Sequence, residues 1–235
     1  MIRTLGVIPA RGGSKGVVGK NVRLVAGEPL VAHSIRAASE SSRLTHFLTS
    51  TDSEQIAAVA SEYGSEVLIR PAHLAQDESP VVPVVMHALQ EAEKRHDCQY
   101  DAIVLLQPTS PIRSGRDIDA VIAMLEEDPQ VEGVISVCPM DDVHPARMYS
   151  LHDGDWMAPL SPEGETTQRQ SLPVVYYRNG SIYAVRKSVL LEQRTVMARR
   201  KKAYVMPREW LANIDDERDL MIADVLLRAW KESRA

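Results

Sequence analysis

Short apolar runs alternate along this chain with longer segments in which apolar residues recur at helical spacing. Strands are predicted at 5–10, 46–51, 66–69, 102–107, 133–137, 174–185 and 203–206. Helices are predicted at 29–42, between Asp52 and Gly64, at 82–95, after Ser114 and after Asp215. Strands that alternate with helices of about ten to fifteen residues form βαβ units. The pattern therefore predicts an α/β fold, with a mostly parallel sheet flanked by helices.

Polar residues at the helix starts support these assignments. Asp52 is expected to cap the second helix, and Ser114 with Asp117 resembles a capping box. Asp216 is likewise well placed to cap the last helix, with Asp219 at its third position.

One segment breaks the rhythm. From 139 to 173, about 35 residues, prolines, glycines and acidic residues replace the periodic pattern. A connection of this length inside a compact domain is unusual without structure of its own. We therefore expect a single domain over 1–235 with 139–173 as a dimerisation arm, a lid or both.

Composition excludes some classes of protein. The net charge of −5 argues against binding nucleic acid through phosphate neutralisation. No apolar run approaches the roughly 20 residues of a membrane span, and the start lacks the apolar core of a signal peptide. Cys98 and Cys138 form no CxxC pair. We expect a cytoplasmic protein with no nucleic-acid or membrane partner.

The loop after the first strand carries the strongest chemical signal. Between Arg11 and Lys20 it has four glycines and three cations, counting Lys15. Glycines let the backbone approach a polyphosphate, and the cations can bind its oxygens. The loop is not a P-loop, because Asn21 follows Lys20. A mobile surface loop with solvated cations is the alternative.

Five motifs in order resemble the acylneuraminate cytidylyltransferases, the CMP-sialic acid synthetases. They are IPARGGSKG at 8–16 followed by Lys20-Asn21, STD at 50–52, RP at 70–71, LLQPTSP at 105–111 and NGSIY at 179–183. The resemblance spans nearly the whole chain. It implies a nucleotide-binding α/β fold, a homodimer and Mg²⁺, and the transfer of CMP from CTP to an acidic nonulosonic sugar with loss of pyrophosphate.

The resemblance also assigns residues to the site. Arg11, Lys20 and Asp215 would be catalytic, and we expect replacement of Lys20 to damage catalysis more than folding. The expected nucleotide-binding residues are Arg11, Gly12, Gly13, Ser14, Lys15, Lys20, Asn21 and Arg70. The expected sugar-binding residues are Gln107, Thr109, Ser110, Arg169, Asn179 and Tyr183. The alternatives are a plain strand end at 107–111, a solvated Arg169 and a Tyr183 that packs in the sheet.

Two segments depart from the family's pattern. Asn213 stands where the family has the first of two metal-binding aspartates, so Asp215 is expected to be the metal ligand with Asn213 as a helper. Residues 75–80 also differ near the expected base site, which leaves selectivity for cytosine open. Two other functions remain possible: a related enzyme that activates the eight-carbon acid Kdo, and a non-catalytic nucleotide-binding regulator.

Overall fold

A seven-stranded sheet forms the centre of the computed structural model, which describes residues 1–76, 79–140 and 143–234. The strands lie in the order β11-β7-β10-β6-β1-β4-β5, and β10 runs antiparallel to both neighbours while all other pairs are parallel. This confirms the predicted mostly parallel sheet. The strands are β1 (Thr4–Pro9), β4 (His46–Thr51), β5 (Glu66–Ile69), β6 (Ala102–Leu106), β7 (Gly133–Met140), β10 (Val175–Arg186) and β11 (Lys201–Val205).

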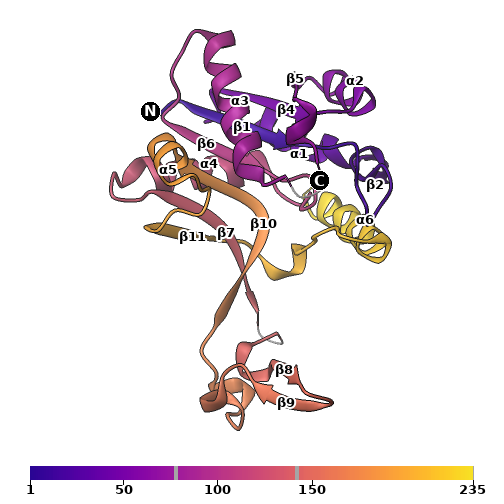
Figure 1. Cartoon of the computed structure of the whole chain (residues 1–235), viewed down its shortest axis with the longest axis vertical. Helices are drawn as coiled ribbons and strands as arrows, with labels where there is room; N and C mark the ends of the chain where they lie inside the picture. Colours follow the sequence, from indigo (N-terminus) through magenta and orange to yellow (C-terminus); the bar gives the residue numbers. More distant parts are fainter. Residues whose placement is uncertain (77–78, 141–142, 235) are drawn as a thin grey trace.

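Helices cover both faces of the sheet (Figure 1). Alternate residues of the central strands point to opposite faces, so Ile8 and Val104 pack into one core cluster while Val7 and Ile103 pack into the other. The first cluster is completed by α1 (Leu30–Glu40), α2 (Glu54–Glu62) and α4 (Gly115–Glu127). The second is completed by α3 (Val81–His96) and α5 (Lys187–Gln193).

The helix starts agree with the sequence in two of three cases. Ser114 with Asp117, and Asp216 with Asp219, form the expected capping boxes. The prediction for α2 was wrong, because its N-cap is Ser53. The carboxylate of Asp52 instead accepts a hydrogen bond from the amide of Gly12 at 3.0 Å. Asp52 therefore serves the glycine-rich loop and not a helix.

A third apolar cluster joins the two ends of the chain. It lies between β2 (Leu24–Val25), β3 (Glu28–Pro29) and α6 (Glu217–Glu232), with Val25, Ile214 and Leu220 among its buried members. Two polar contacts fix the β2–β3 hairpin: the Val25 carbonyl lies 2.8 Å from His33 Nε2, and the Ala26 amide donates to Asp224. This packing brings the C-terminal segment against the loop that follows β1.

The strands β7 and β10 continue past the sheet and carry residues 143–174 away from the main body (Figure 1). We call residues 143–174 the arm. It holds a hairpin, β8 (Tyr149–His152) and β9 (Trp156–Pro159), with short 3-10 turns η3 (Pro145–Arg147), η4 (Pro162–Gly164) and η5 (Arg169–Ser171). The expected start at 139 was slightly early, because Pro139 and Met140 still pair with β10.

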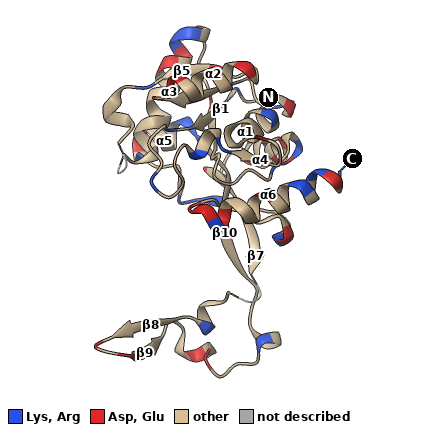
Figure 2. Ribbon diagram, turned by 90° about the vertical axis from the view of Figure 1, so that its right-hand side faces the viewer, with Lys and Arg blue, Asp and Glu red and all other residues tan. Residues whose placement is uncertain are grey.

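The hairpin of the arm exposes large apolar side chains. Trp156 is 78% exposed, and Leu151 and Met157 are also largely in solvent. Charged residues are absent from β8 and β9 and acidic residues mark their turn (Figure 2). Separately, none of the described helices is both long and apolar enough to cross a bilayer.

Candidate functional site

A cavity of about 410 Å³ opens at the carboxyl edge of the parallel strands, where α/β sheets place their ligands. Among the described residues, four cations and one carboxylate, that of Asp215, line it. The lining residues are Pro9, Arg11, Ser14, Lys15, Gly16, Lys20, Asn21, Arg70, Ser79, Val81, Val84, Gln107, Pro108, Thr109 and Asp215. Such an excess of positive charge in a concave site favours an anionic ligand.

Hydrogen bonds to neighbouring segments shape the loop between β1 and η1 (Lys20–Val22). The Ala10 amide donates to the Ser50 carbonyl at 2.9 Å, and Asn21 Nδ2 donates to the Arg11 carbonyl at 2.9 Å. Gly19 has a φ of +63°, in the left-handed region that glycine adopts readily. These contacts build a defined loop, which argues against the alternative of a mobile surface segment.

Lys20 is buried, unlike the solvated cations of the alternative. Its side chain is inside the structure, the residue is only 9% exposed, and Nζ donates to the Ile214 carbonyl at 2.6 Å and lies 3.5 Å from the Asp215 carbonyl. Burial lowers the pKa of Lys20, and the charge of Asp215 opposes that shift. Lys20 therefore also links the loop to the C-terminal segment, so we expect its replacement to affect folding as well as the site.

Arg70, at the end of β5, contributes a second buried cation. It is 6% exposed, and its Nη2 lies 3.8 Å from Asp52 Oδ1, an ion-pair distance too long for a hydrogen bond. Among the described residues, its Nε and Nη2 have no hydrogen-bond partner. Burial lowers the pKa of Arg70, with Asp52 opposing. A buried guanidinium with unused donors beside a cavity suits an anionic ligand.

The turn after β6 supplies another wall of the cavity. Gln107 and Thr109 line it, whereas Ser110 is buried behind it and donates to the Asn179 carbonyl at 2.9 Å. Gly180 has a φ of +78°, and a Cβ there would lie 2.7 Å from Ser110 Oγ. The backbone of β10 therefore approaches this turn more closely than a side chain would allow.

Besides Ser110, three more of the residues expected to bind sugar lie outside the cavity lining. Asn179 is buried, and its Oδ1 accepts hydrogen bonds from Ser136 Oγ at 2.6 Å and the Ser181 amide at 3.2 Å. Tyr183 packs in the sheet core, which agrees with the alternative for it. Arg169 lies on the arm beside a separate hollow that includes His144 and Pro173. In one chain, the structure does not bring these three side chains into the cavity.

The segment before α6 places Asp215 at the cavity and Asn213 behind it. Asn213 Nδ2 donates to Asp215 Oδ2 at 2.8 Å, while Asn213 Oδ1 lies 3.2 Å from Ser110 Oγ. Within the described ranges, no three His, Cys, Asp or Glu side chains are grouped so as to hold a metal ion. Of the residues that the structure describes in the cavity lining, Asp215 is thus the one that offers a carboxylate to a cation.

Sequence analysis missed some residues of the site. Asp52 was assigned to a helix cap, although its place directly after a strand was the available signal. Ser79, Val81 and Val84 bring the start of α3 to the cavity, next to the segment whose departure from the family pattern was noted. Asp77 and Glu78 of that segment lie outside the described residues.

The sheet, the crevice at its carboxyl edge and the cation-lined cavity define the class, an α/β protein with a pocket suited to a polyphosphate. The family follows from the sequence: this chain belongs to the cytidylyltransferase family, whose sequence model matches residues 5–217. The chain is therefore a nucleotidyltransferase, as the resemblance implied.

Similar proteins agree with this assignment. The chain is 34% identical over 97% of its length to post-translational flagellin modification protein B of Campylobacter coli, and covers 96% of that protein. It is 38% identical over 83% of its length to CMP-N,N'-diacetyllegionaminic acid synthase of Legionella pneumophila, of which it covers 82%. It is 32% identical over 94% of its length to N-acylneuraminate cytidylyltransferase of Escherichia coli, but spans only 51% of that longer protein.

A solved structure with the same fold is CMP:2-keto-3-deoxy-manno-octonic acid synthetase in complex with CTP. The TM-score is 0.69 at 15% identity, and the match covers 97% of this chain and 99% of the other. At that identity the likeness concerns the fold alone.

The contact between Gly16 and the C-terminal segment gives a direct test of the site's construction. A Cβ at Gly16 would lie 1.9 Å from the Asp215 carbonyl oxygen, so Gly16→Ala must displace backbone. We expect it to lower the free energy of unfolding by about 1–3 kcal/mol, the usual cost of overpacking. Denaturant unfolding measures this.

Gly13→Ala is the matched control in the same loop. A Cβ at Gly13 meets nothing within 4 Å, and its φ is not in the left-handed region. We expect that variant to be neutral, or more stable by about 0.4–1 kcal/mol through a less flexible unfolded chain. Equal effects of the two substitutions would contradict the close packing described here.

Proposed function

We propose that this cytidylyltransferase transfers CMP from CTP to an acidic nonulosonic sugar of the sialic, legionaminic or pseudaminic acid type, in the cytoplasm. The observation that carries the proposal is the cavity with Arg11, Lys15, Lys20 and Arg70 in its walls. A nucleoside triphosphate has the charge and the flexible oxygens that such a set of cations binds. The names of the relatives in Legionella and Escherichia support the class of sugar.

The chain's residues divide the work of the reaction. The loop of Gly12, Gly13 and Ser14 lets the triphosphate approach the backbone, and the cations oppose the charge that develops on its oxygens. A hydroxyl oxygen of the sugar forms a bond to the α-phosphorus, the bond between that phosphorus and the bridging α–β oxygen breaks, and pyrophosphate leaves. Phosphorus chemistry of this kind depends mainly on positioning and fixed positive charge.

The turn after β6 is the proposed sugar side of the cavity. Gln107 offers a donor and an acceptor, and Thr109 a hydroxyl, to a polyhydroxylated ligand. Ser110 and Asn179 would act from behind the cavity wall, because the Ser110 hydroxyl donates to the Asn179 carbonyl and the Asn179 side chain accepts from Ser136 Oγ.

The deciding experiment is pyrophosphate release with CTP and a panel of acidic sugars. We expect turnover with CTP and a nine-carbon acid, and loss of turnover by a factor of about 10²–10³ in Lys20→Met, since fixed charge at the phosphates is removed. Lys20→Met keeps most of the apolar stem, so thermal unfolding separates lost catalysis from lost structure.

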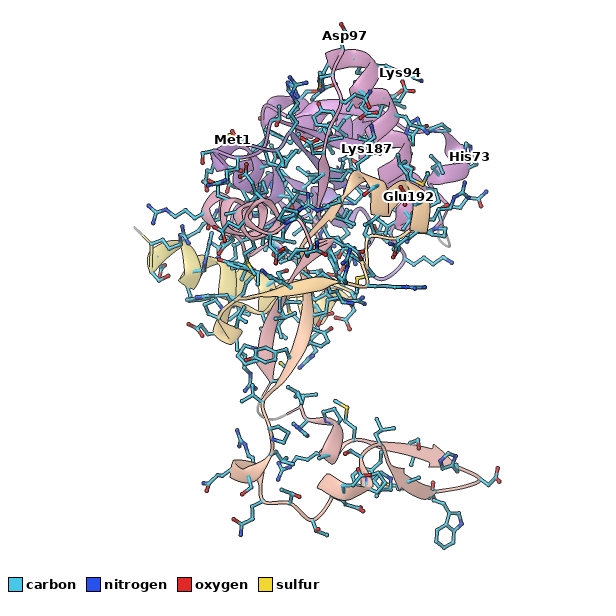
Figure 3. The ribbon with its side chains drawn as sticks, turned by 90° about the vertical axis from the view of Figure 1, so that its left-hand side faces the viewer. Met1, His73, Lys94, Asp97, Lys187 and Glu192 are labelled. Atoms are coloured by element: carbon cyan, nitrogen blue, oxygen red, sulfur yellow. The ribbon has the colours of Figure 1, made fainter. Side chains whose placement is uncertain are left out.

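Lys94→Met is the control, because Lys94 lies on α3 at the end of the body far from the arm (Figure 3) and forms an ion pair with Glu91. Turnover with Kdo alone would replace the proposed sugar. Binding of CTP without release of pyrophosphate from any sugar would favour a regulator.

Magnesium is the proposed cofactor, and Asp215 is the residue at the cavity that fits it. Mg²⁺ is commonly bound by one or two carboxylates together with phosphate oxygens and water. Asp215 can supply the carboxylate at the cavity, and the nucleotide phosphates would supply further oxygens. When bound, the ion would help to neutralise charge on the triphosphate. Asn213 can assist only with its amide oxygen, which already lies near Ser110 Oγ.

The metal proposal predicts opposite effects for two substitutions. Asp215→Ala should abolish magnesium-dependent activity and weaken Mn²⁺ binding in the presence of CTP, measured by calorimetry, because the carboxylate is gone. Asn213→Asp should lower the metal concentration needed for half-maximal activity, since a second negative oxygen joins Asp215. Full activity of Asp215→Ala at ordinary magnesium would place the ion on other residues.

The arm is the proposed dimerisation element. A projecting hairpin with Leu151, Trp156 and Met157 in solvent needs a covering surface, because contiguous exposed apolar side chains mark interaction sites. We assign that surface to a second copy of this chain. In such a dimer the arm would carry Arg169 towards the sugar site of the partner. Within a single chain, Arg169 does not line the cavity.

Sedimentation at micromolar concentration tests the dimer. We expect a dimer for the unaltered chain, and for Trp156→Asp a dissociation constant raised by a factor of roughly 30 or more, as for a central aromatic contact worth about 2 kcal/mol. Met221→Asp is the control, because Met221 is similarly exposed but lies on α6 in the main body. A fully active monomer would contradict the proposal.

A further inference from the structure

A buried guanidinium holds the turn between β6 and α4 from behind the cavity. Arg113 is 2% exposed. Its Nη2 donates to the Gln107 carbonyl at 2.8 Å and to Ser34 Oγ at 2.6 Å. Its Nη1 donates to the Gln107 carbonyl at 3.2 Å and to the Ser110 carbonyl. Arg113 therefore joins both ends of this turn to α1, the helix that follows the β2–β3 hairpin.

The charge of Arg113 is not cancelled by a bonded carboxylate. In the described ranges its hydrogen-bond acceptors are two carbonyls and a hydroxyl. Burial lowers the pKa of Arg113, and the carboxylate that opposes the shift is Asp117. Asp117 itself bonds to the Ser114 amide and the Tyr204 hydroxyl. Arginine keeps its proton in proteins, so a buried positive charge remains beneath the turn.

The hydrogen bonds from Arg113 fix the position of the turn that lines the cavity. Because the carbonyls of Gln107 and Ser110 are bonded to Arg113, the turn cannot rotate without breaking charge-assisted hydrogen bonds. The side chains of Gln107 and Thr109 line the cavity. The Thr109 carbonyl also accepts from the Ile214 amide at 2.9 Å, which ties the turn to the segment that carries Asp215.

We propose that Arg113 is a positioning residue for the acidic sugar: it fixes Gln107 and Thr109 at the cavity wall, and its charge favours a carboxylate ligand there. The inference rests on the proposed function, since it concerns the sugar of that reaction. A neutral residue could fill the space, but it would remove the positive charge and the donors to the Ser110 carbonyl and Ser34 Oγ, and would leave the Gln107 carbonyl with the Ser110 amide at 3.2 Å.

Kinetics of Arg113→Lys and Arg113→Met test the proposal. Loss of hydrogen bonds to a charged group, at about 1.5–3 kcal/mol, should raise the KM for the acidic sugar by roughly tenfold to a hundredfold in the methionine variant. The lysine variant keeps the charge but not the fork, so its sugar KM should lie between the two. The KM for CTP should stay within about twofold in both, because the phosphate loop is untouched.

Arg116→Met is the matched control, since it removes the same charge three residues away, from a side chain that is exposed on α4. Its sugar KM should equal that of the unaltered enzyme. Should Arg113→Met fail to fold, Arg113→Lys and Ser34→Ala decide the question, because each removes only part of the bonding.

The inference is overturned if the sugar KM is unchanged in the variants that fold. It is also overturned if the KM for CTP rises as much as the KM for the sugar. Either result leaves Arg113 a purely structural residue. The proposed function is judged separately, because its failure would be seen as no sugar-dependent pyrophosphate release by the unaltered enzyme.

Discussion

The hydrogen bond from Lys20 Nζ to the Ile214 carbonyl joins the two ends of this chain at the site. The two residues are far apart in the sequence and lie in direct contact in the fold. Gly16, in the same loop, closely approaches the Asp215 carbonyl beside this contact. The apolar cluster beneath them also holds the loop after β1 against the segment before α6. The cavity exists because these two segments meet, with Lys20 on one wall and Asp215 on the other.

This arrangement concentrates buried cations in a chain of net negative charge. Lys20, Arg70 and Arg113 each have a pKa lowered by burial, and for each the opposing effect comes first from a single aspartate, Asp215, Asp52 and Asp117 respectively. Buried charge that is only partly compensated opposes folding. A bound polyanion would supply the missing negative charge, so ligand binding and stability are linked: whatever binds the folded cavity also stabilises it.

The sequence predicted features that depend on neighbours in the chain. Alternation of apolar runs identified the parallel sheet, and Ser114 and Asp216 identified two helix starts that the structure confirms. The failures are contacts between distant segments. Asp52 has the residue type of an N-cap, but Ser53 takes that place and Asp52 bonds to Gly12, forty residues earlier. Nothing local to Lys20 or Arg113 indicates their burial, because the acceptors that justify it come from other elements.

The residues proposed to bind sugar are distributed over two parts of the chain. Gln107 and Thr109 lie on rigid structure at the end of the central strand, whereas Arg169 lies on the arm, beyond the point where β7 and β10 leave the sheet. An antiparallel ribbon such as this one keeps its backbone hydrogen bonds satisfied between its own two strands. It can therefore extend from the sheet without the support of the core. A strand pair that leaves its own core while exposing Trp156 and Leu151 at its far end is suited to reach another molecule, and poorly suited to fold back on its own cavity. On this argument the nucleotide half of the site is a property of the single chain, and the sugar half a property of the proposed pair.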